Sequence, residues 1–173
     1  METAKTGEEL KRENRRRVLA LLEERGIPYE LEEHPAAHTI QEMMELGLSH
    51  PEWVCKNLFL RDAKGRRHFL VTVRGDKHAD LGRLAAEMDS TKLSFASPER
   101  LMEYLGVEQG SVSPLCILND GEVEVEVFFD RDLRDQPLLG VHPNDNTATL
   151  YLSWETVRDI IRGHGNSFQE IRV

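Results

Sequence analysis

Residues 54–74, VCKNLFLRDAKGRRHFLVTVR, decide the fold, because they describe two apolar strands joined by a tight turn. Apolar residues dominate 54–61 and 68–74, and Asp62-Ala63-Lys64-Gly65 between them has the composition of a hairpin turn. Lys56 is unexpected in such a segment. A buried ammonium loses hydration unless it meets an anion or a carbonyl oxygen. Lys56 is therefore either a strand-end lysine that reaches water or part of a binding site.

Before the hairpin, the sequence predicts two helices and one strand. Thr6 and Glu9 have capping-box spacing, which predicts a helix over 7–25 that Gly26 ends. A short strand over 29–33 follows. Thr39 and Glu42 repeat the capping spacing and predict a second, short helix that ends at Gly47.

After the hairpin, short helices and strands alternate. Ser97-Pro98 is typical of a helix start, and Gly106 of a helix end. The alternation in 122–130 predicts a strand with Val123, Val125 and Val127 facing the core. The remaining predicted elements are helices over 80–88 and 154–162 and strands over 92–96, 115–118, 147–152 and 168–173.

This alternation favours a single α/β or α+β domain, and 173 residues with 39% hydrophobic side chains suffice for one core. We expect residues 1–28 to form a helix packed on the domain and residues 29–173 to form one globular unit. Lys11, Arg12 and Arg15–Arg17 on that helix could instead contact RNA, but packing is the favoured interpretation.

The formal net charge of −9 argues against broad binding along nucleic-acid backbones, DNA included, although a local basic pocket could still grip one RNA end. No apolar run approaches the ~20 residues that span a bilayer, and because the N-terminal residues are polar we expect no secretory signal there. Cys55 and Cys116 fit buried thiols of a cytoplasmic protein. Neither they nor the histidines show metal-ligand spacing, so we expect no metal and no cofactor.

Three further segments could carry chemistry, although each also fits a purely structural role. The loop Gly110 to Pro114 begins with a residue that allows close approach and ends with one that fixes the backbone, so it could orient water or stabilise an oxyanion. His142, in the segment VHPN before Asn146, could donate a hydrogen bond or shuttle a proton, or simply belong to a turn. His34, near Thr39, could touch a ligand or shape a loop.

Together these segments resemble the ProX/YbaK family of prolyl-tRNA editing domains. The resemblance covers about 29–162 and is carried by LEEHPAAHT, CKNLFLRDAKGRRHFLVTV, LSFASPERLMEYLGVEQGSVSPLCILND and VHPNDNTATLYLS, in that order. It implies an α/β domain with a mixed, curved sheet flanked by helices. The implied activity is hydrolysis of the ester between a wrong amino acid and the terminal adenosine of a tRNA.

The resemblance also implies roles for individual residues. Lys56 corresponds to the family's essential lysine, which anchors the terminal nucleotide, and the backbone of the loop from Gly110 positions the aminoacyl carbonyl and the attacking water. His142 corresponds to the pocket histidine, and no side chain is assigned as general base. The expected catalytic residues are Lys56, Gly110 and His142, and the expected substrate contacts are His34, Thr39, Asn57, Ser111, Val112, Ser113, Pro114 and Asn144.

The closest branch by resemblance removes alanine from tRNA-Pro, and this is the expected substrate. A cysteinyl-tRNA-Pro or a seryl- or threonyl-tRNA deacylase of the same fold, and a non-catalytic module that binds tRNA or a synthetase, are the alternatives. A prolyl-tRNA synthetase or an elongation factor could deliver the aminoacylated tRNA. A small pocket would admit alanine and reject proline, with walls expected from Met43, Met44, Val54, Leu58 and Val112, although the two methionines also fit the core.

Overall fold

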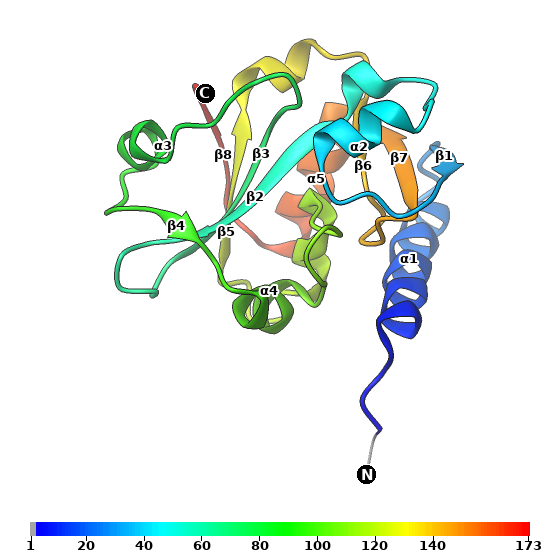
Figure 1. The fold of residues 1–173 in the computed structure, drawn as a ribbon, viewed down its shortest axis with the longest axis horizontal. Coiled ribbons are helices and arrows are strands. Elements are labelled where there is room, and N and C mark those ends of the chain that lie inside the picture. Colours follow the sequence, from blue (N-terminus) through cyan, green and yellow to red (C-terminus); the bar gives the residue numbers. More distant parts are fainter. Residues whose placement is uncertain (1–2) are drawn as a thin grey trace.

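The predicted hairpin lies at the centre of a five-stranded mixed sheet (Figure 1). In the computed structural model, which describes residues 3–173, β2 (Cys55–Arg61) pairs antiparallel with β3 (His68–Arg74) along their whole length. On the other side of β3, β5 (Val125–Asp130) and then β8 (Phe168–Ile171) continue the sheet in parallel. The short β4 (Ser94–Phe95) pairs with the end of β2.

A second sheet, which the sequence analysis did not separate from the first, contains three antiparallel strands. In it β7 (Ala148–Leu152) lies between β1 (Glu30–Glu33) and β6 (Leu139–Val141). A single bridge between Val54 and Gly140 connects the two sheets. A Cβ on Gly140 would lie 3.0 Å from the Val54 Cα, so a glycine allows this close approach. The expected mixed α/β architecture is confirmed, but its strands form two sheets.

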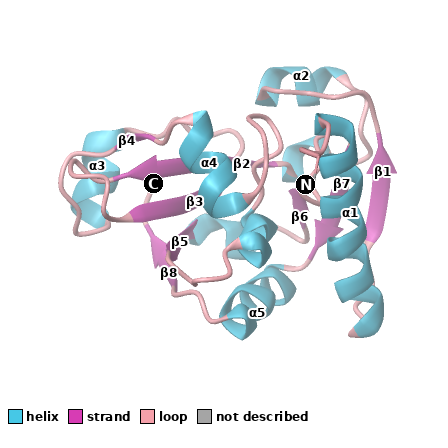
Figure 2. Cartoon of the chain, turned by 90° about the horizontal axis from the view of Figure 1, so that it is seen from below, coloured by secondary structure: helices cyan, strands magenta, loops and turns pink. Residues whose placement is uncertain are grey.

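Five helices surround the strands, and each begins at a side-chain cap. The cap oxygens of Thr6, Thr39, Asp80, Ser97 and Ser153 each accept a hydrogen bond from the third backbone amide of their helix. Figure 2 shows α1 beside the three-stranded sheet and α3 at the opposite end of the molecule, near β4. The helices are α1 (Gly7–Glu24), α2 (Ile40–Glu45), α3 (Leu81–Glu87), α4 (Pro98–Leu105) and α5 (Trp154–His164).

Two predicted features are wrong. The segment 115–118 lies in a 3-10 helix, Pro114–Asn119, because Ser113 caps its start and Pro114 occupies its first turn. Val123 does not face the core: it has a φ of +54° and is 39% exposed. The Asp120 carboxylate accepts hydrogen bonds from the amides of residues 124 and 125, which holds a turn here and delays the strand to Val125.

The main core joins both sheets to α1, α4 and α5, and Val18 and Leu22 of α1 are buried in it. A second apolar cluster lies between the other face of the five-stranded sheet and α3. A small third cluster around Met43 holds α2 against Val54. Within the part of the chain that the structure describes, no helix combines the length and the apolarity needed to cross a membrane.

Candidate active site

A cavity of about 420 Å³ opens along one edge of β2. Its walls come from α2 and the loop before it, from β2, from β4 and the start of α4, from the loop 109–112, and from β6 and β7. Among the predicted site residues, those that line it are Thr39, Lys56, Asn57, Gly110, Val112 and His142. The predicted site residues outside the lining are His34, Ser111, Ser113, Pro114 and Asn144.

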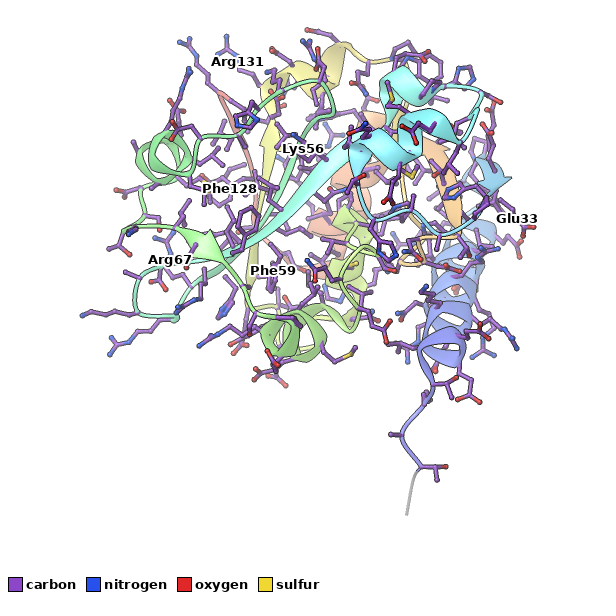
Figure 3. All side chains as sticks on the ribbon, viewed as in Figure 1. Glu33, Lys56, Phe59, Arg67, Phe128 and Arg131 are labelled. Carbon is purple, nitrogen blue, oxygen red and sulfur yellow. The ribbon has the colours of Figure 1, made fainter. Side chains whose placement is uncertain are left out.

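Lys56 is partly exposed on β2, near the middle of the molecule (Figure 3). Its Nζ donates a hydrogen bond of 2.7 Å to the backbone carbonyl of Lys77, in the loop after β3. An ammonium has three donors, so two remain for a ligand. This loop passes so close to the start of β2 that a Cβ on Gly75 would lie only 2.3 Å from the Val54 carbonyl oxygen.

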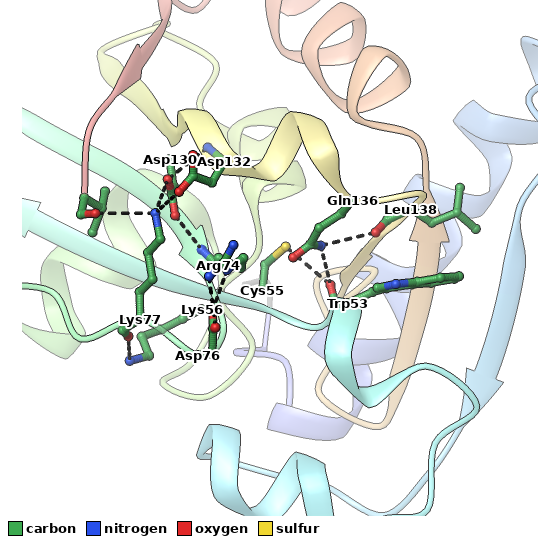
Figure 4. A network of polar contacts seen from close by, with 11 residues as sticks. Trp53, Cys55, Lys56, Arg74, Asp76, Lys77, Asp130, Asp132, Gln136 and Leu138 are labelled. Carbon is green, nitrogen blue, oxygen red and sulfur yellow. Dashed lines mark hydrogen bonds and ion pairs between the residues drawn. The ribbon is translucent and has the colours of Figure 1, made fainter.

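The loop that holds Lys56 is itself anchored by a buried ion pair (Figure 4). Lys77 Nζ lies 2.9 Å from Asp130 Oδ1 and 2.7 Å from Asp132 Oδ2, and Asp130 is fully buried at the end of β5. Burial alone would lower the pKa of Lys77, but hydrogen bonds to the two carboxylates outweigh it and raise the pKa. Lys77 therefore stays charged, and its carbonyl stays in place beside Lys56.

Asn57 lies on the open part of the β2 edge. Its Oδ1 accepts a hydrogen bond of 2.7 Å from the buried hydroxyl of Thr72. The carbonyl of Phe59 accepts from Ala96 N at 3.0 Å, and β4 pairs no further along β2. Because hydrogen-bonding directions alternate along a strand, the backbone of Asn57 points to this same edge and faces the cavity.

The loop from Gly110 presents alternate residues to the cavity. Gly110 has a φ of +95°, and a Cβ there would lie 2.5 Å from His38 Nδ1, so only glycine fits. Gly110 and Val112 line the cavity, whereas Ser111 and Ser113 are buried beneath it. The hydroxyl of Ser113 accepts from the Leu115 amide and starts the 3-10 helix.

Pro114 and Asn144 also lie beneath the cavity, where they fix neighbouring segments. Pro114 is buried in the first turn of the 3-10 helix. Asn144 is 2% exposed, donates to the Leu115 carbonyl at 3.1 Å and accepts from the Cys116 thiol at 3.2 Å. Pro114 and Asn144, which the sequence analysis expected to contact substrate, therefore support the neighbouring loops and do not form part of the cavity wall.

His142 brings an imidazole acceptor to the cavity. Its Nδ1 lies 2.8 Å from the Ala148 carbonyl, which can only accept, so Nδ1 carries the proton. Burial lowers the pKa of His142 to about 4, and the ring is therefore neutral at pH 7. Its Nε2 then has a free lone pair that can accept a hydrogen bond from a ligand.

His34 does not line the cavity, but it contacts Thr149, which does. Its Nδ1 donates to the Pro35 carbonyl at 2.9 Å, and its Nε2 lies 2.8 Å from the hydroxyl of Thr149. Thr149 is fully buried and lines the cavity. The sequence analysis treated 147–152 only as a strand; the alternation of polar Thr147 and Thr149 with apolar residues was the signal that could have pointed to the site.

The apolar walls match most of the expected set. Met43, Val54, Leu58 and Val112 line the cavity, and Met43 is also part of the small core beneath α2. Met44 was expected in the wall but does not line it and is 53% exposed, because it lies on the outer side of α2. Sequence reasoning missed Phe95, His38 and Gln109, which also line the cavity.

Cys55 also lines the cavity, but its thiol is not poised for nucleophilic attack. Burial raises the pKa of Cys55 to about 12, and burial does the same to Cys116. A thiolate is the reactive form, so both thiols are inert at neutral pH. Residues 3–173 contain no group of three or more His, Cys, Asp or Glu side chains that could hold a metal ion.

The site therefore offers an ammonium, a neutral imidazole acceptor and unpaired backbone groups around an apolar pocket. Such a set suits a protein that binds and orients a small acyl group attached to a larger polar ligand. A family comparison gives the class: residues 34–160 match the aminoacyl-tRNA editing domain, and the chain belongs to this family. The predicted family and the predicted enzyme class, an aminoacyl-tRNA deacylase, are confirmed.

Individual relatives agree with this assignment. The chain is 47% identical to the prolyl-tRNA editing protein ProX of Acetoanaerobium sticklandii over 156 residues, covering 90% of this chain and 95% of that protein. It is 40% identical to prolyl-tRNA synthetase associated domain-containing protein 1 of Danio rerio, covering 75% of this chain and 70% of that protein. A solved structure described as a candidate trans-editing enzyme for prolyl-tRNA synthetase has the same fold, with a TM-score of 0.67 at 23% identity, and covers 92% of this chain and 97% of that one.

Proposed function

We propose that this protein hydrolyses mischarged tRNA-Pro in trans and that alanyl-tRNA-Pro is its substrate. The observation that carries the proposal is the placement of Lys56 and His142 on the walls of one small, largely apolar cavity. The names of the two relatives, a prolyl-tRNA editing protein and a prolyl-tRNA synthetase associated protein, support the choice of tRNA-Pro.

Lys56 anchors the terminal nucleotide in this proposal. The Lys77 carbonyl takes one of its three donors and fixes the direction of the side chain. The other two donors face a ligand and suit a phosphate or ribose oxygen. Since the ammonium is already ordered, little side-chain entropy is lost when RNA binds.

The reaction itself needs positioning more than a strong base. An aminoacyl ester carries an electron-withdrawing ammonium next to its carbonyl, so it is already activated towards water. The Nε2 of His142 accepts a hydrogen bond from that ammonium, and backbone groups near Gly110 and Asn57 orient the carbonyl and the attacking water. A ribose hydroxyl of the substrate assists the water, and no side chain is needed as general base.

Pocket size provides the selectivity. Met43, Val54, Leu58 and Val112 line the cavity, and in this proposal they bound the space that the small side chain occupies. A synthetase that binds proline discriminates against the smaller alanine by only ~1–3 kcal/mol, so alanine escapes its first selection. A second site that is too small for the proline ring can then remove alanine without touching the correct product.

The decisive experiment compares deacylation of tRNA-Pro charged with alanine, cysteine, serine and proline. Alanyl-tRNA-Pro is expected to be hydrolysed fastest and prolyl-tRNA-Pro to survive. Faster loss of cysteine or serine would replace alanine as the substrate while keeping the enzyme class. Retention of charged tRNA without ester loss would identify a non-catalytic binding module instead. Adding prolyl-tRNA synthetase or an elongation factor to the assay tests whether either one delivers the substrate.

A further inference from the structure

Phe95 is an aromatic side chain exposed at the wall of the active-site cavity. It is 61% exposed, the highest value among the large hydrophobic residues that are exposed in residues 3–173. It belongs to none of the apolar clusters, and its ring packs against no other aromatic ring in that part of the chain. A single exposed apolar side chain is common on protein surfaces, but Phe95 also lines the cavity that Lys56 and His142 line, so its ring is available to a ligand there.

The backbone holds Phe95 in a fixed place. It lies opposite Leu60 in the short pairing of β4 with β2, and the next residue donates its amide to the Phe59 carbonyl. The chain then enters α4 at its Ser97 cap. Phe95 is therefore presented by ordered structure, and a ring with only two side-chain torsions loses little entropy on binding.

Phe95 and Lys56 lie on the same face of the sheet. Side chains alternate along β2, so Lys56, Leu58 and Leu60 share a face, and Phe95 lies across from Leu60. Leu60 is four positions after Lys56 along the strand, which corresponds to about 13 Å. One nucleotide with its aminoacyl group can span the stretch between the Lys56 ammonium and the Phe95 ring.

Two arginines lie at the hairpin end next to β4, although the alternation along β2 and β4 places Arg61 on the opposite face of the sheet from Phe95. Arg61 lies opposite Ser94, and the guanidinium groups of Arg61 and Arg100 both approach Gly65, where a Cβ would lie 3.0 and 2.9 Å from them. Neither arginine forms an ion pair with a carboxylate of residues 3–173. In a chain of net charge −9, the two arginines beside Gly65 form a local basic site that suits a polyanion. A single exposed ring at the wall of a cavity that also contains the Lys56 ammonium fits a nucleobase better than an apolar protein surface.

We propose that the base of the 3′-terminal nucleotide stacks on Phe95 while Lys56 holds the ester end of the same nucleotide. This inference rests on the proposed function and adds a binding residue to it. Stacking of a base on an aromatic side chain contributes about 1–3 kcal/mol, which corresponds to about 5- to 150-fold in affinity.

The test combines protein variants with two RNAs. Uncharged acceptor-stem minihelices are prepared with a terminal adenosine or with an abasic terminal ribose, and their dissociation constants are measured by fluorescence anisotropy. The wild type is expected to bind the adenosine RNA at least fivefold more tightly than the abasic RNA. Phe95→Ala and Phe95→Leu should remove this difference, whereas Phe95→Trp should keep it. Met102→Ala is the matched control, because Met102 is 41% exposed on α4 but does not line the cavity.

Two results would overturn the stacking proposal. One is absence of a base-dependent difference in the wild type, including absence of any binding. The other is a difference that survives in Phe95→Ala or is retained in Phe95→Leu as well as in Phe95→Trp. Deacylation of alanyl-tRNA-Pro by the wild type is measured separately, so base-dependent binding without hydrolysis would instead contradict the proposed function.

Discussion

The Nζ of Lys56 and the backbone carbonyl of Lys77, 2.7 Å apart, connect the active-site cavity to a buried ion pair. The side chain of Lys77 meets Asp130 and Asp132, while its carbonyl directs the ammonium of Lys56. One residue thus fixes both a loop and the direction of the lysine on which the proposed mechanism depends. Substitutions of Lys56 and of Lys77 test how much each residue contributes to activity and to stability.

Replacement of Lys56 by alanine should abolish deacylation of alanyl-tRNA-Pro and leave the fold intact. Lys56 is partly exposed and makes one side-chain hydrogen bond, to a carbonyl that can turn to water, so the free energy of unfolding should change by about 1 kcal/mol or less. Single-turnover deacylation and urea denaturation measure the two effects. Wild-type-like activity in this variant would contradict the proposed mechanism.

Lys77→Met should lower stability as well as activity. It leaves the fully buried Asp130 without its cation, and loss of one partner of a buried pair costs about 3–5 kcal/mol. Urea denaturation measures this change. Lys64→Met, an exposed lysine at the hairpin tip, is the matched control and should shift the free energy of unfolding by about 0.5 kcal/mol at most. An equal effect of the two substitutions would show that the ion pair does not stabilise the loop.

His142 should titrate far below the usual range for histidine. Its pKa of about 4 lies below the unfolded value near 6.5, so between these two values the unfolded chain binds more protons. Stability should therefore rise with pH from about 4 to about 6.5 and show no further change from this group above that. NMR titration of the imidazole gives the pKa directly, and His142→Asn should remove this contribution to the slope. A pKa near 6.5 in the folded protein would contradict the burial of the ring.

Gly110→Ala should distort the loop that lines the cavity. The new Cβ would meet His38 Nδ1 at 2.5 Å, and the φ of +95° is unfavourable for alanine. We expect a loss of about 1–3 kcal/mol of stability and a fall in kcat/KM. Gly26→Ala is the matched control, because its φ is also positive, at +63°, but nothing lies within 4 Å. Gly26→Ala should lose some stability because of its positive φ, but it should keep its deacylation activity.

Replacement of Arg15 should destabilise the protein, although α1 precedes residues 34–160, which match the editing-domain family. Its guanidinium contacts Asp145 at 2.9 Å, Thr147 at 2.7 Å and Glu33 at 2.9 Å, and so holds the segment between His142 and Thr149. Arg15→Met should cost about 1.5–3 kcal/mol, since hydrogen bonds to charged groups are lost.

Arg17→Met, on the same helix, is the control for Arg15. Arg17 is exposed, and within residues 3–173 its guanidinium hydrogen-bonds only with Glu13 and Asn119, so its loss should leave stability and activity nearly unchanged. Thermal unfolding and deacylation rates compare the two variants. If both behave alike, α1 does not support the site through Arg15.

Local sequence signals predicted the elements well where the deciding contact is local. The caps at Thr6, Thr39 and Ser97 each reach a backbone amide three residues away, and the hairpin turn joins adjacent strands. The prediction failed at 115–118 and at Val123, where a proline start and the Asp120 carboxylate redirect an apolar segment. Apolar composition alone does not distinguish a buried strand from a buried 3-10 helix.

The sequence by itself determined the helices, the central hairpin and the motifs that identify the family, because these depend on residues a few positions apart. Only the tertiary structure decided that Lys56 donates a hydrogen bond to the Lys77 carbonyl. It also decided that Gly110 lies against His38 and that Phe95 is exposed at the cavity. It also placed His34, Ser113 and Asn144 behind the wall instead of in it. Such contacts join residues that are remote in the chain, and the packing of two sheets around one core sets their distances.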